Sequence, residues 1–286
     1  MRGFKTIKKQ PTQPQSQPQY EVADVLNKLG SKLEDLGLNS WQLRTLFALK
    51  KCRTSALGGH IDACDECGNI SISYNSCRNR HCPKCQGRNR EDWIQTRETE
   101  LLPVPYFHVV FTLPEVLNKT ALHEPKMLYD ILFESAWETL QTFGKNKNLQ
   151  MGMIAVLHTW GQNLSLHPHL HCIVPGGGVD ENGAWKNIKN DGKFLFSVKA
   201  LSKVFRAKFC EKLKANLKDK FNENQENEYE KIRQSLWEKP WVVYAKKPFG
   251  SPKSVVEYLG RYTHKIAISN GRIRGIDDKT VTFDYK

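Results

Sequence analysis

The most informative segment of the chain for fold and function is Leu166-His167-Pro168-His169-Leu170-His171-Cys172-Ile173-Val174-Pro175. Its three histidines alternate with other residues and run into a β-branched segment, which predicts a strand. Successive side chains of a strand point to opposite faces of a sheet, so His167, His169 and His171 should share one face. Because imidazoles two residues apart can bind one divalent metal ion, the stretch predicts a metal site on a sheet.

A second motif, Tyr258-Leu259-Gly260-Arg261-Tyr262, carries two phenols four residues apart. On a helix, both hydroxyls would lie on one face, one turn apart. Tyrosines at this spacing are more often half-buried amphipathic residues than nucleophiles, and histidine pairs on strands are often ordinary polar residues. Found together in a basic chain, the two motifs favour a metal-assisted nuclease that attacks phosphodiesters with tyrosine.

The charge of the chain favours a polyanionic partner. Its 286 residues include 43 Lys and Arg against 30 Asp and Glu, which gives a net charge of +13 and a pI near 9.3. Nucleic acid is the first candidate partner, although many soluble basic proteins share this balance. No secretory signal opens the sequence, and no apolar run approaches the roughly 20 residues that cross a bilayer. We therefore expect a cytoplasmic protein that acts on DNA, with no membrane partner and an oligomeric state that the sequence leaves open.

Composition and periodicity divide the chain into three parts. Residues 1–20 are rich in Gln, Pro and Lys and should form a disordered leader. Residues 21–100 should form a zinc-binding and DNA-binding domain, and residues 101–286 an α+β domain with a largely antiparallel sheet. The apolar periodicity predicts helices at 21–30, 40–51, 88–102, 126–143, 198–217 and 252–264, and strands at 107–112, 153–160, 166–174 and 241–245. A short polar turn joins the second and third of these strands, which suits a hairpin.

The cysteines form two knuckles, Cys64-x-x-Cys67 and Cys82-x-x-Cys85, with fourteen residues between them. Each knuckle can offer two thiolates, and two knuckles can close a tetrahedral four-thiolate zinc site. This zinc would be structural, because the segment has too few apolar residues to form its own core. Four further candidates could build a second zinc site or support the first: Cys52, His60, Cys77 and His81.

Basic residues surround the second cysteine knuckle. At that density on a small module they would neutralise DNA phosphates and give salt-dependent affinity. A solvated basic face is the alternative interpretation. The residues are Arg78, Arg80, Lys84, Arg88 and Arg90.

Four segments together resemble the IS91 family of transposases. Residues 64–86 are similar to the zinc-binding domain of that family, and residues 106–114, Tyr-Phe-His-Val-Val-Phe-Thr-Leu-Pro, also resemble it. Residues 167–171 resemble its His-hydrophobic-His (HUH) motif, and residues 258–262 its two-tyrosine motif. The four segments stand in the order of the family. The resemblance implies an HUH endonuclease that performs rolling-circle transposition on a ferredoxin-like antiparallel sheet, preceded by a helical, zinc-ribbon-like module.

The resemblance also implies roles for individual residues. His169 and His171 match the two motif histidines and would bind catalytic Mg²⁺ or Mn²⁺, with the third ligand left open among His167, Gln162 and His158. Tyr258 and Tyr262 would be the nucleophiles that nick and rejoin single-stranded DNA at element ends through a phosphotyrosine. Two cations near them on the helix would hold the phosphate or lie on a solvated face: Arg261 and Lys265.

The C-terminal end departs from the pattern of the family. The sequence stops at Lys286 in what reads as a strand, whereas family members generally continue, so we expect a C-terminally truncated nuclease domain. Two other functions remain open: a catalytically inactive copy that only binds DNA through its zinc module, and a rolling-circle replication initiator or relaxase-like nickase. The zinc module in front of the histidine motif favours the transposase.

Overall fold

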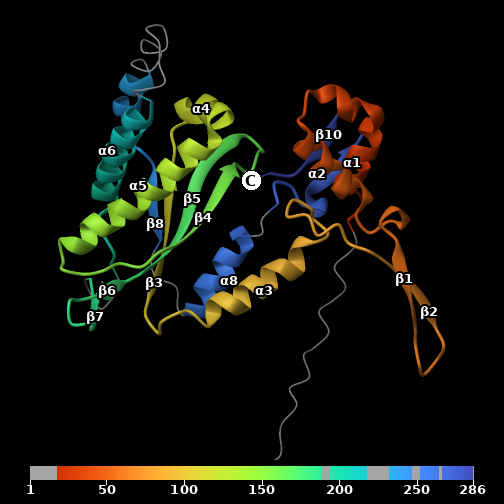
Figure 1. Cartoon of the computed structure of the whole chain (residues 1–286), viewed down its shortest axis with the longest axis horizontal. Helices are drawn as coiled ribbons and strands as arrows, with labels where there is room; N and C mark the ends of the chain where they lie inside the picture. Colours follow the sequence, from red (N-terminus) through yellow and green to blue (C-terminus); the bar gives the residue numbers. More distant parts are fainter. Residues whose placement is uncertain (1–17, 189–193, 218–231, 247–251, 264–265, 286) are drawn as a thin grey trace, which may run out of the picture. The chain divides into compact units, whose positions relative to one another are not determined.

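The computed structural model of the chain describes residues 18–188, 194–217, 232–246, 252–263 and 266–285 (Figure 1). The chain forms two compact units, one of Met1–Pro83 with Ile268–Lys286 and the other of Lys84–Ala267. This division differs from the expected boundary after residue 100, and the last residues belong with the first unit. Almost all of the expected disordered leader lies outside the described residues. Within the described residues, no helix is long and apolar enough to cross a bilayer.

The first unit begins with the helices α1 (Val22–Leu29), η1 (Gly30–Leu36) and α2 (Ser40–Lys51), which confirm the two predicted N-terminal helices. Asn39 caps α2, because its side chain accepts from the Gln42 N–H at 2.9 Å and the Gln42 side chain accepts in return from the Asn39 N–H. Leu26, Leu33 and Leu49 are buried. A small apolar core therefore stabilises this part.

The C-terminal residues join the first unit through hydrogen bonds and charge. They form η5 (Asn270–Arg272) and the antiparallel pair β9 (Ile273–Ile276) and β10 (Val281–Phe283). The Asn270 Oδ1 accepts from the Val22 N–H at 3.0 Å, and the Lys28 Nζ lies 3.0 Å from an Asp278 carboxylate oxygen. These contacts explain why the terminal hairpin lies with α1.

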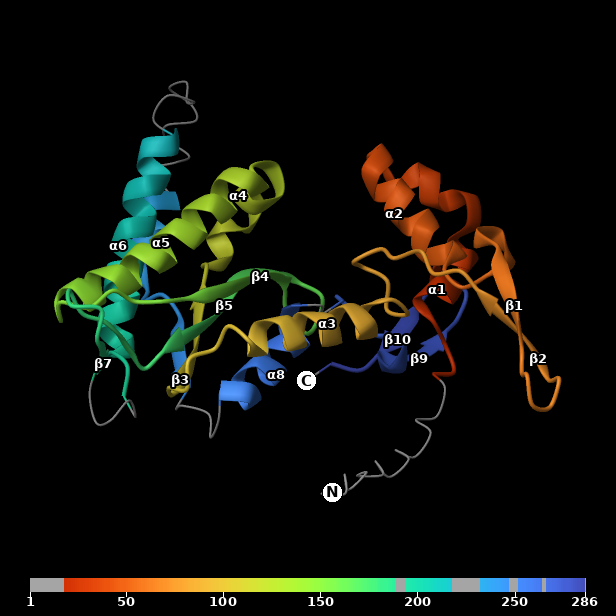
Figure 2. The ribbon, with the colours of Figure 1, turned by 60° about the horizontal axis from the view of Figure 1, so that its bottom comes forward.

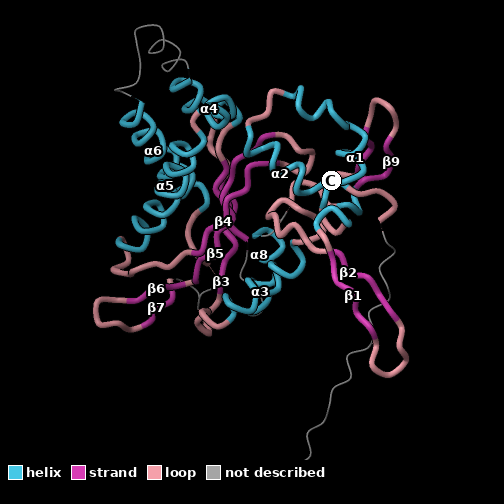
Figure 3. The backbone as a smooth tube through the Cα atoms, turned by 45° about the vertical axis from the view of Figure 1, so that its right-hand side comes forward, coloured by secondary structure: helices cyan, strands magenta, loops and turns pink. Residues whose placement is uncertain are grey.

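A long hairpin, which the sequence did not lead us to expect, follows α2 and the short η2 (Ser55–Leu57) (Figure 3). Its strands are β1 (Gly59–Ala63) and β2 (Ile70–Tyr74), and they pair antiparallel from Gly59 with Tyr74 to Ala63 with Ile70. Nearly every residue of the hairpin is exposed.

The second unit is built on a four-stranded antiparallel sheet. Its strands are β3 (Tyr106–Thr112), β4 (Ile154–Trp160), β5 (Leu166–Pro175) and β8 (Val243–Lys246), in the order β4-β5-β3-β8. The four predicted strands are confirmed, and so is the predicted hairpin of β4 with β5. A small separate pair, β6 (Gly177–Val179) and β7 (Trp185–Asn187), continues from the glycines that end β5.

Helices cover both faces of this sheet (Figures 1 and 2). On one face lie α5 (Pro125–Lys145) and α6 (Val198–Leu217), preceded by η3 (Glu115–Leu117) and α4 (Asn118–His123), and residues 232–238 are also helical. On the other face lie α3 (Gln86–Glu98) and α8 (Pro252–Thr263). The predicted helices are thus confirmed, although α3 begins and ends earlier than the predicted 88–102.

The period of two along the strands separates an apolar face from a histidine face. On β3, Phe107, Val109 and Phe111 belong to the core under α5 and α6. Leu170 and Cys172 of β5 belong to that same core. The alternate residues of both strands, including their histidines, must therefore point to the face that α8 covers.

A glycine sets the distance between α3 and α8. A Cβ on Gly260 would lie 2.5 Å from the Ile94 Cγ1 of α3, much closer than real Cβ contacts come. Ile94, Val255 and Val256 form a second small core with residues of the sheet. The glycine between the two motif tyrosines therefore has a packing role, because it lets α8 seat closely against α3.

Candidate active site and metal centre

Three histidines meet on the α8 face of the sheet. His158 on β4 pairs directly with His169 on β5, and His171 is the next residue of β5 on the same face. The ring nitrogens that these three residues offer all lie within 4.8 Å of one another. His158 and His171 are buried and His169 is half-buried, so the cluster lies at the edge of the core.

The geometry of the cluster fits a divalent metal ion. His169 Nδ1 lies 2.6 Å from the His167 carbonyl oxygen, so Nδ1–H donates there and the lone pair of His169 stays on Nε2. That Nε2 lies 3.1 Å from His171 Nε2. Neighbouring ligands of an octahedral ion with bonds of about 2.1 Å lie about 3 Å apart. The two Nε2 atoms therefore stand at the spacing that one shared ion requires.

A fourth histidine, His108 on β3, supports the cluster from behind. Its Nε2 lies 2.8 Å from His171 Nδ1, and the two ring planes differ by only 12°. Burial, with smaller contributions from Lys246 and His169, lowers the pKa of His108 to about 4, so the ring is neutral near neutral pH. If His171 offers Nε2 to a metal, its Nδ1–H must donate to His108 Nε2. His108 then fixes both the tautomer and the ring orientation of His171.

Tyr258 of α8 contacts the supporting histidine, His108. The centroid of its ring is 5.1 Å from that of His108, edge to face, and the Lys246 Nζ lies 5.5 Å from the centre of the Tyr258 ring. Helix α8 carries Tyr262 one turn later, as the sequence predicts, but the side chains of Tyr262 and Arg261 are outside the described residues. Lys265 is wholly outside them.

The structure brings together only some of the candidate metal ligands. His169 and His171 lie in the cluster, and His158 stands in the third position. His167 is not part of this cluster and its side chain is exposed, and Gln162 is exposed in the turn after β4. The antiparallel register places His158 directly opposite His169, which gives the cluster its third member.

His108 was not singled out from the sequence. The sequence did contain a signal for His108. It lies between Phe107 and Val109 in residues 106–114, so its side chain must point to the face of the strand opposite these two apolar residues.

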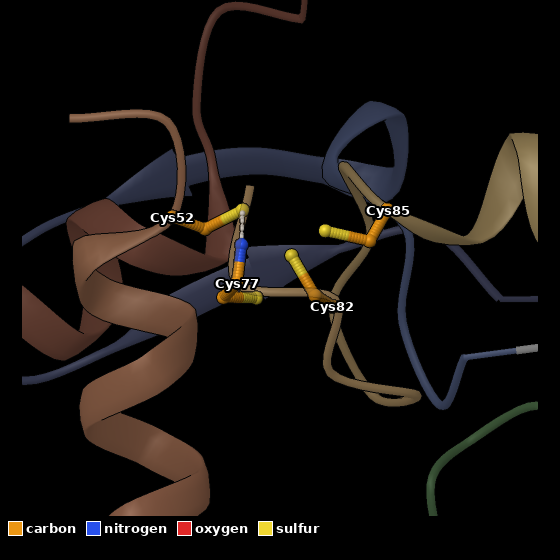
Figure 4. Close-up of side chains that lie close together, drawn as sticks. All are labelled: Cys52, Cys77, Cys82 and Cys85. Carbon is orange, nitrogen blue, oxygen red and sulfur yellow. Dashed lines mark hydrogen bonds between the residues drawn. The ribbon is translucent and has the colours of Figure 1, made fainter. Parts of the chain in front are cut away.

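A second cluster is made of cysteines. The sulfur atoms of four cysteines lie within 4.8 Å of one another, and Figure 4 shows these side chains converging: Cys52, Cys77, Cys82 and Cys85. Cys52 and Cys82 are buried. Burial raises the pKa of the Cys77 thiol to about 11. Thiolates around a tetrahedral zinc ion lie about 3.8 Å apart, so the four sulfurs fit one zinc.

This arrangement differs from the expected pairing of the two knuckles. Cys82 and Cys85 join the cluster, whereas Cys64 and Cys67 are exposed at the turn of the β1–β2 hairpin. Five paired positions with a rise of about 3.4 Å each put that turn roughly 15 Å from the hairpin base. The base holds the ends together, since the Arg53 N–H donates to the Asn75 carbonyl at 3.1 Å, and this brings Cys52 close to Cys77.

The knuckle at the hairpin turn has its own hydrogen bonds. The Gly68 N–H donates to the Cys64 carbonyl at 2.8 Å, and Gly68 has the positive φ of +67° that this tight turn requires. Backbone N–H groups of Cys67 and Glu66 lower the pKa of the Cys64 thiol.

The two candidate histidines of the zinc module lie outside the cysteine cluster. His60 is exposed, and its Nε2 lies 3.6 Å from an Asp62 oxygen. His81 contacts Trp41 edge to face at 6.1 Å, and partial burial lowers its pKa. Within the described residues, neither contributes to a group of metal ligands.

The basic residues named from the sequence are mostly accessible. Arg78, Arg80 and Arg90 are exposed and Lys84 is half-buried, whereas the side chain of Arg88 is outside the described residues. Arg78 is unusual because its φ is +51°, a conformation uncommon for any residue other than glycine.

Known proteins resemble the chain over nearly its whole length. A family model of the IS91-type "Transposase zinc-binding domain" matches residues 24–113, and one described as "Putative transposase" matches residues 152–286. "Putative transposase y4qJ" of Sinorhizobium fredii is 43% identical over 279 residues, which cover 93% of this chain and 70% of that protein. The "Transposase for insertion sequence element IS801" of Pseudomonas savastanoi pv. phaseolicola is 29% identical over 263 residues, which cover 88% of this chain and 62% of that protein.

Solved structures resemble the chain only weakly. A conjugative relaxase TrwC in complex with mutant oriT DNA has a TM-score of 0.32 at 12% identity, covering 67% of this chain and 64% of that one. A copper-bound complex of the same relaxase has a TM-score of 0.29 at 15% identity, covering 37% of this chain and 41% of that one. These scores add nothing to the assignment, which rests on the sequence matches. Those matches confirm the resemblance drawn from the four motifs: the chain belongs to the IS91 family of transposases.

Proposed function

We propose that the chain nicks and rejoins single-stranded DNA at the ends of a mobile element through a phosphotyrosine, as an HUH transposase of the rolling-circle type. One observation carries this proposal. A tyrosine of the two-tyrosine helix lies beside a cluster of histidines suited to a metal ion, on the same face of the sheet. A protein that only bound DNA would need neither the buried histidines nor a tyrosine in contact with His108.

The connectivity of the second unit supports the HUH assignment. Its elements run β3-α5-β4-β5-α6-β8, a β-α-β-β-α-β order, and the sheet order β4-β5-β3-β8 is antiparallel throughout. This is the ferredoxin-like arrangement that the family resemblance implies. In it, the strand that carries the histidine motif lies in the interior of the sheet, where its register is well defined.

The nitrogen donors for the catalytic ion would be His158, His169 and His171, with His108 holding His171. An ion held there would polarise the scissile phosphate. Manganese suits this set of donors better than magnesium, because imidazole is a poorer ligand for the harder magnesium ion.

Tyr258 would be the first nucleophile. A phenol is a weak acid, so the Tyr258 hydroxyl must lose its proton as the oxygen attacks phosphorus. The new O–P bond forms as a deoxyribose oxygen leaves and takes up a proton. The resulting phosphotyrosine conserves the energy of the phosphodiester, so a second hydroxyl can later attack it and rejoin the strand. Lys246 places positive charge beside the ring of Tyr258.

The structural zinc would be bound by Cys52, Cys77, Cys82 and Cys85. Cys52 and Cys77 thus take the places that the knuckle spacing predicted for Cys64 and Cys67. The convergence of their sulfurs supports this, and the exposed position of Cys64 argues against a site shared by the two knuckles. The zinc would hold Cys52 and Cys77, at the base of the β1–β2 hairpin, to the Cys82–Cys85 knuckle.

The proposal is tested with labelled single-stranded oligonucleotides that carry the ends of the element, incubated with the full chain and Mn²⁺. We expect a covalent protein–DNA adduct on denaturing gels. The adduct should be lost when His169 and His171 are both replaced by alanine, while DNA binding persists through Arg and Lys. A protein that binds the oligonucleotides but forms no adduct would be an inactive copy, and one that forms the adduct but joins no second end would be a nickase.

A further inference from the structure

The zinc module contains a hollow that no role above accounts for. It has a volume of about 770 Å³ and lies at the base of the β1–β2 hairpin. The residues that line it are Arg53, His60, Ile72, Ser73, Tyr74, Asn75, Ser76 and Arg78. The described lining residues include two arginines and no Asp or Glu, and the one carboxylate that contacts the lining, Asp62, bonds to Ser73 and His60. The two arginines therefore leave the hollow with a net positive charge.

The two arginines are placed by the cysteine cluster itself. Each follows a cysteine directly, as Cys52-Arg53 and Cys77-Arg78, and each has a positive φ, of +56° and +51°. Residues other than glycine rarely adopt this conformation. At Arg78 it turns the next N–H, that of Asn79, toward the Cys77 sulfur at 3.5 Å. The backbone that forms the metal site therefore also directs both arginines to the hollow.

Asn75 holds the wall of the hollow in place. Its carbonyl accepts from the Arg53 N–H at 3.1 Å, its own N–H donates to the Gly58 carbonyl at 3.0 Å, and its side-chain amide donates to the Leu57 carbonyl at 3.0 Å. The shape of the hollow is thus set by hydrogen bonds of the hairpin base.

The hairpin supplies an apolar surface beside the arginines. Tyr74 and Ile72 lie on the same face of β2 and both line the hollow. Their exposed fractions are 45% and 62%, which is high for an aromatic and a large aliphatic side chain. An exposed aromatic ring next to arginines is the combination by which proteins bind unpaired nucleotides, since the ring stacks on a base and the cations hold the backbone.

We propose that this hollow binds one nucleotide of single-stranded DNA, with Arg53 and Arg78 on its phosphate and the Tyr74 ring against its base. The inference rests on the proposed function only in taking DNA as the ligand. It adds a site for the unpaired strand in the zinc module, separate from the residues that would cut it.

The test measures binding by the full chain, without added Mn²⁺, to a fluorescent oligothymidylate and to an abasic oligonucleotide of equal length. Replacing Arg53 and Arg78 with glutamine should weaken binding to both probes at least about tenfold and flatten the salt dependence by about 0.7 per lost phosphate contact. Tyr74→Ala should weaken binding to the oligothymidylate about fivefold or more and leave binding to the abasic probe unchanged. Tyr74→Phe should bind as wild type, and Arg44→Gln, an exposed arginine of α2, is the matched charge control.

Zinc content is measured on every variant. If the double arginine variant loses zinc together with DNA binding, the arginines balance the charge of the cysteine cluster and the proposal is overturned. Unchanged binding by that variant, or equal weakening of both probes by Tyr74→Ala, would also overturn it. These binding measurements do not involve Tyr258 or the histidine cluster. Failure of this proposal can therefore be distinguished from failure of adduct formation.

Discussion

The hydrogen bond between His108 and His171 allows a quantitative prediction. His108→Phe keeps an aromatic ring beside Tyr258 but removes the acceptor for the His171 Nδ1–H. The bond is 2.8 Å long, its rings are nearly parallel, and both residues are buried, so water cannot readily replace the lost partner. A buried donor without an acceptor costs about 1–3 kcal/mol. The metal affinity should therefore fall roughly 10- to 100-fold, the loss typical of a missing partner behind a histidine ligand.

The assay is calorimetric titration of Mn²⁺ into the purified full chain, which needs no DNA. His108→Gln retains a side-chain acceptor and should recover much of the affinity, and His123→Gln on the exposed surface of α4 should bind as wild type. At saturating Mn²⁺ the phenylalanine variant should regain most of its adduct formation. Wild-type Mn²⁺ affinity in His108→Phe would refute the argument.

The lowered pKa of His108 predicts a pH effect of known sign in the metal-free protein. Between about pH 6.5 and 4, His108 binds a proton in the unfolded chain but not in the folded chain. The free energy of unfolding of the wild type therefore falls as the pH is lowered through this window. His108→Phe removes this contribution, and its melting temperature should fall less steeply over the same range.

Three further predictions concern packing and metal sites. Cys52→Ser should lose the zinc and lower the melting temperature, whereas Cys64→Ser should keep its zinc; the reverse result would restore the two-knuckle site. His158→Ala should abolish Mn²⁺ binding and His167→Ala should leave it nearly intact, which calorimetry would show. Gly260→Ala should lower stability by about 1–3 kcal/mol in thermal unfolding through overpacking against α3, while Gly271→Ala, which has open space around it, should change little.

Much of the second unit could be predicted because its strands are short apolar or β-branched runs bounded by Pro, Gly and polar turns, and because the histidines of residues 166–174 alternate with other residues. The same alternation that identified residues 166–174 as a strand assigned His169 and His171 to one face, and the short turn after Trp160 predicted the hairpin. The cluster member His158 and the supporting His108 both depend on pairing between strands. His158 reaches the site through the β4–β5 register and His108 through the β3–β5 register, and residue spacing within one strand carries no information on either.

The cysteine module shows where spacing misleads. Two Cys-x-x-Cys knuckles fourteen residues apart suggest one four-thiolate site, but the intervening chain forms a hairpin that separates them. Strand β2 alternates as Ile70-Ser71-Ile72-Ser73-Tyr74, a period of two that could have indicated a strand, although its side chains are mostly exposed rather than part of a core. It is the hairpin that pairs Cys52 with Cys77, which are distant in sequence.

Identification of the amino acid that becomes linked to DNA tests the central claim most directly. Trypsin cleaves after Lys253, Arg261 and Lys265, so Tyr258 and Tyr262 fall on separate peptides, residues 254–261 and 262–265. After a short incubation of the full chain with single-stranded element ends and Mn²⁺, followed by nuclease and trypsin, mass spectrometry should find the nucleotide on residues 254–261. We expect Tyr258 first because its ring lies at the histidine face, 5.1 Å from His108. A nucleotide on a peptide that contains neither tyrosine would contradict the mechanism.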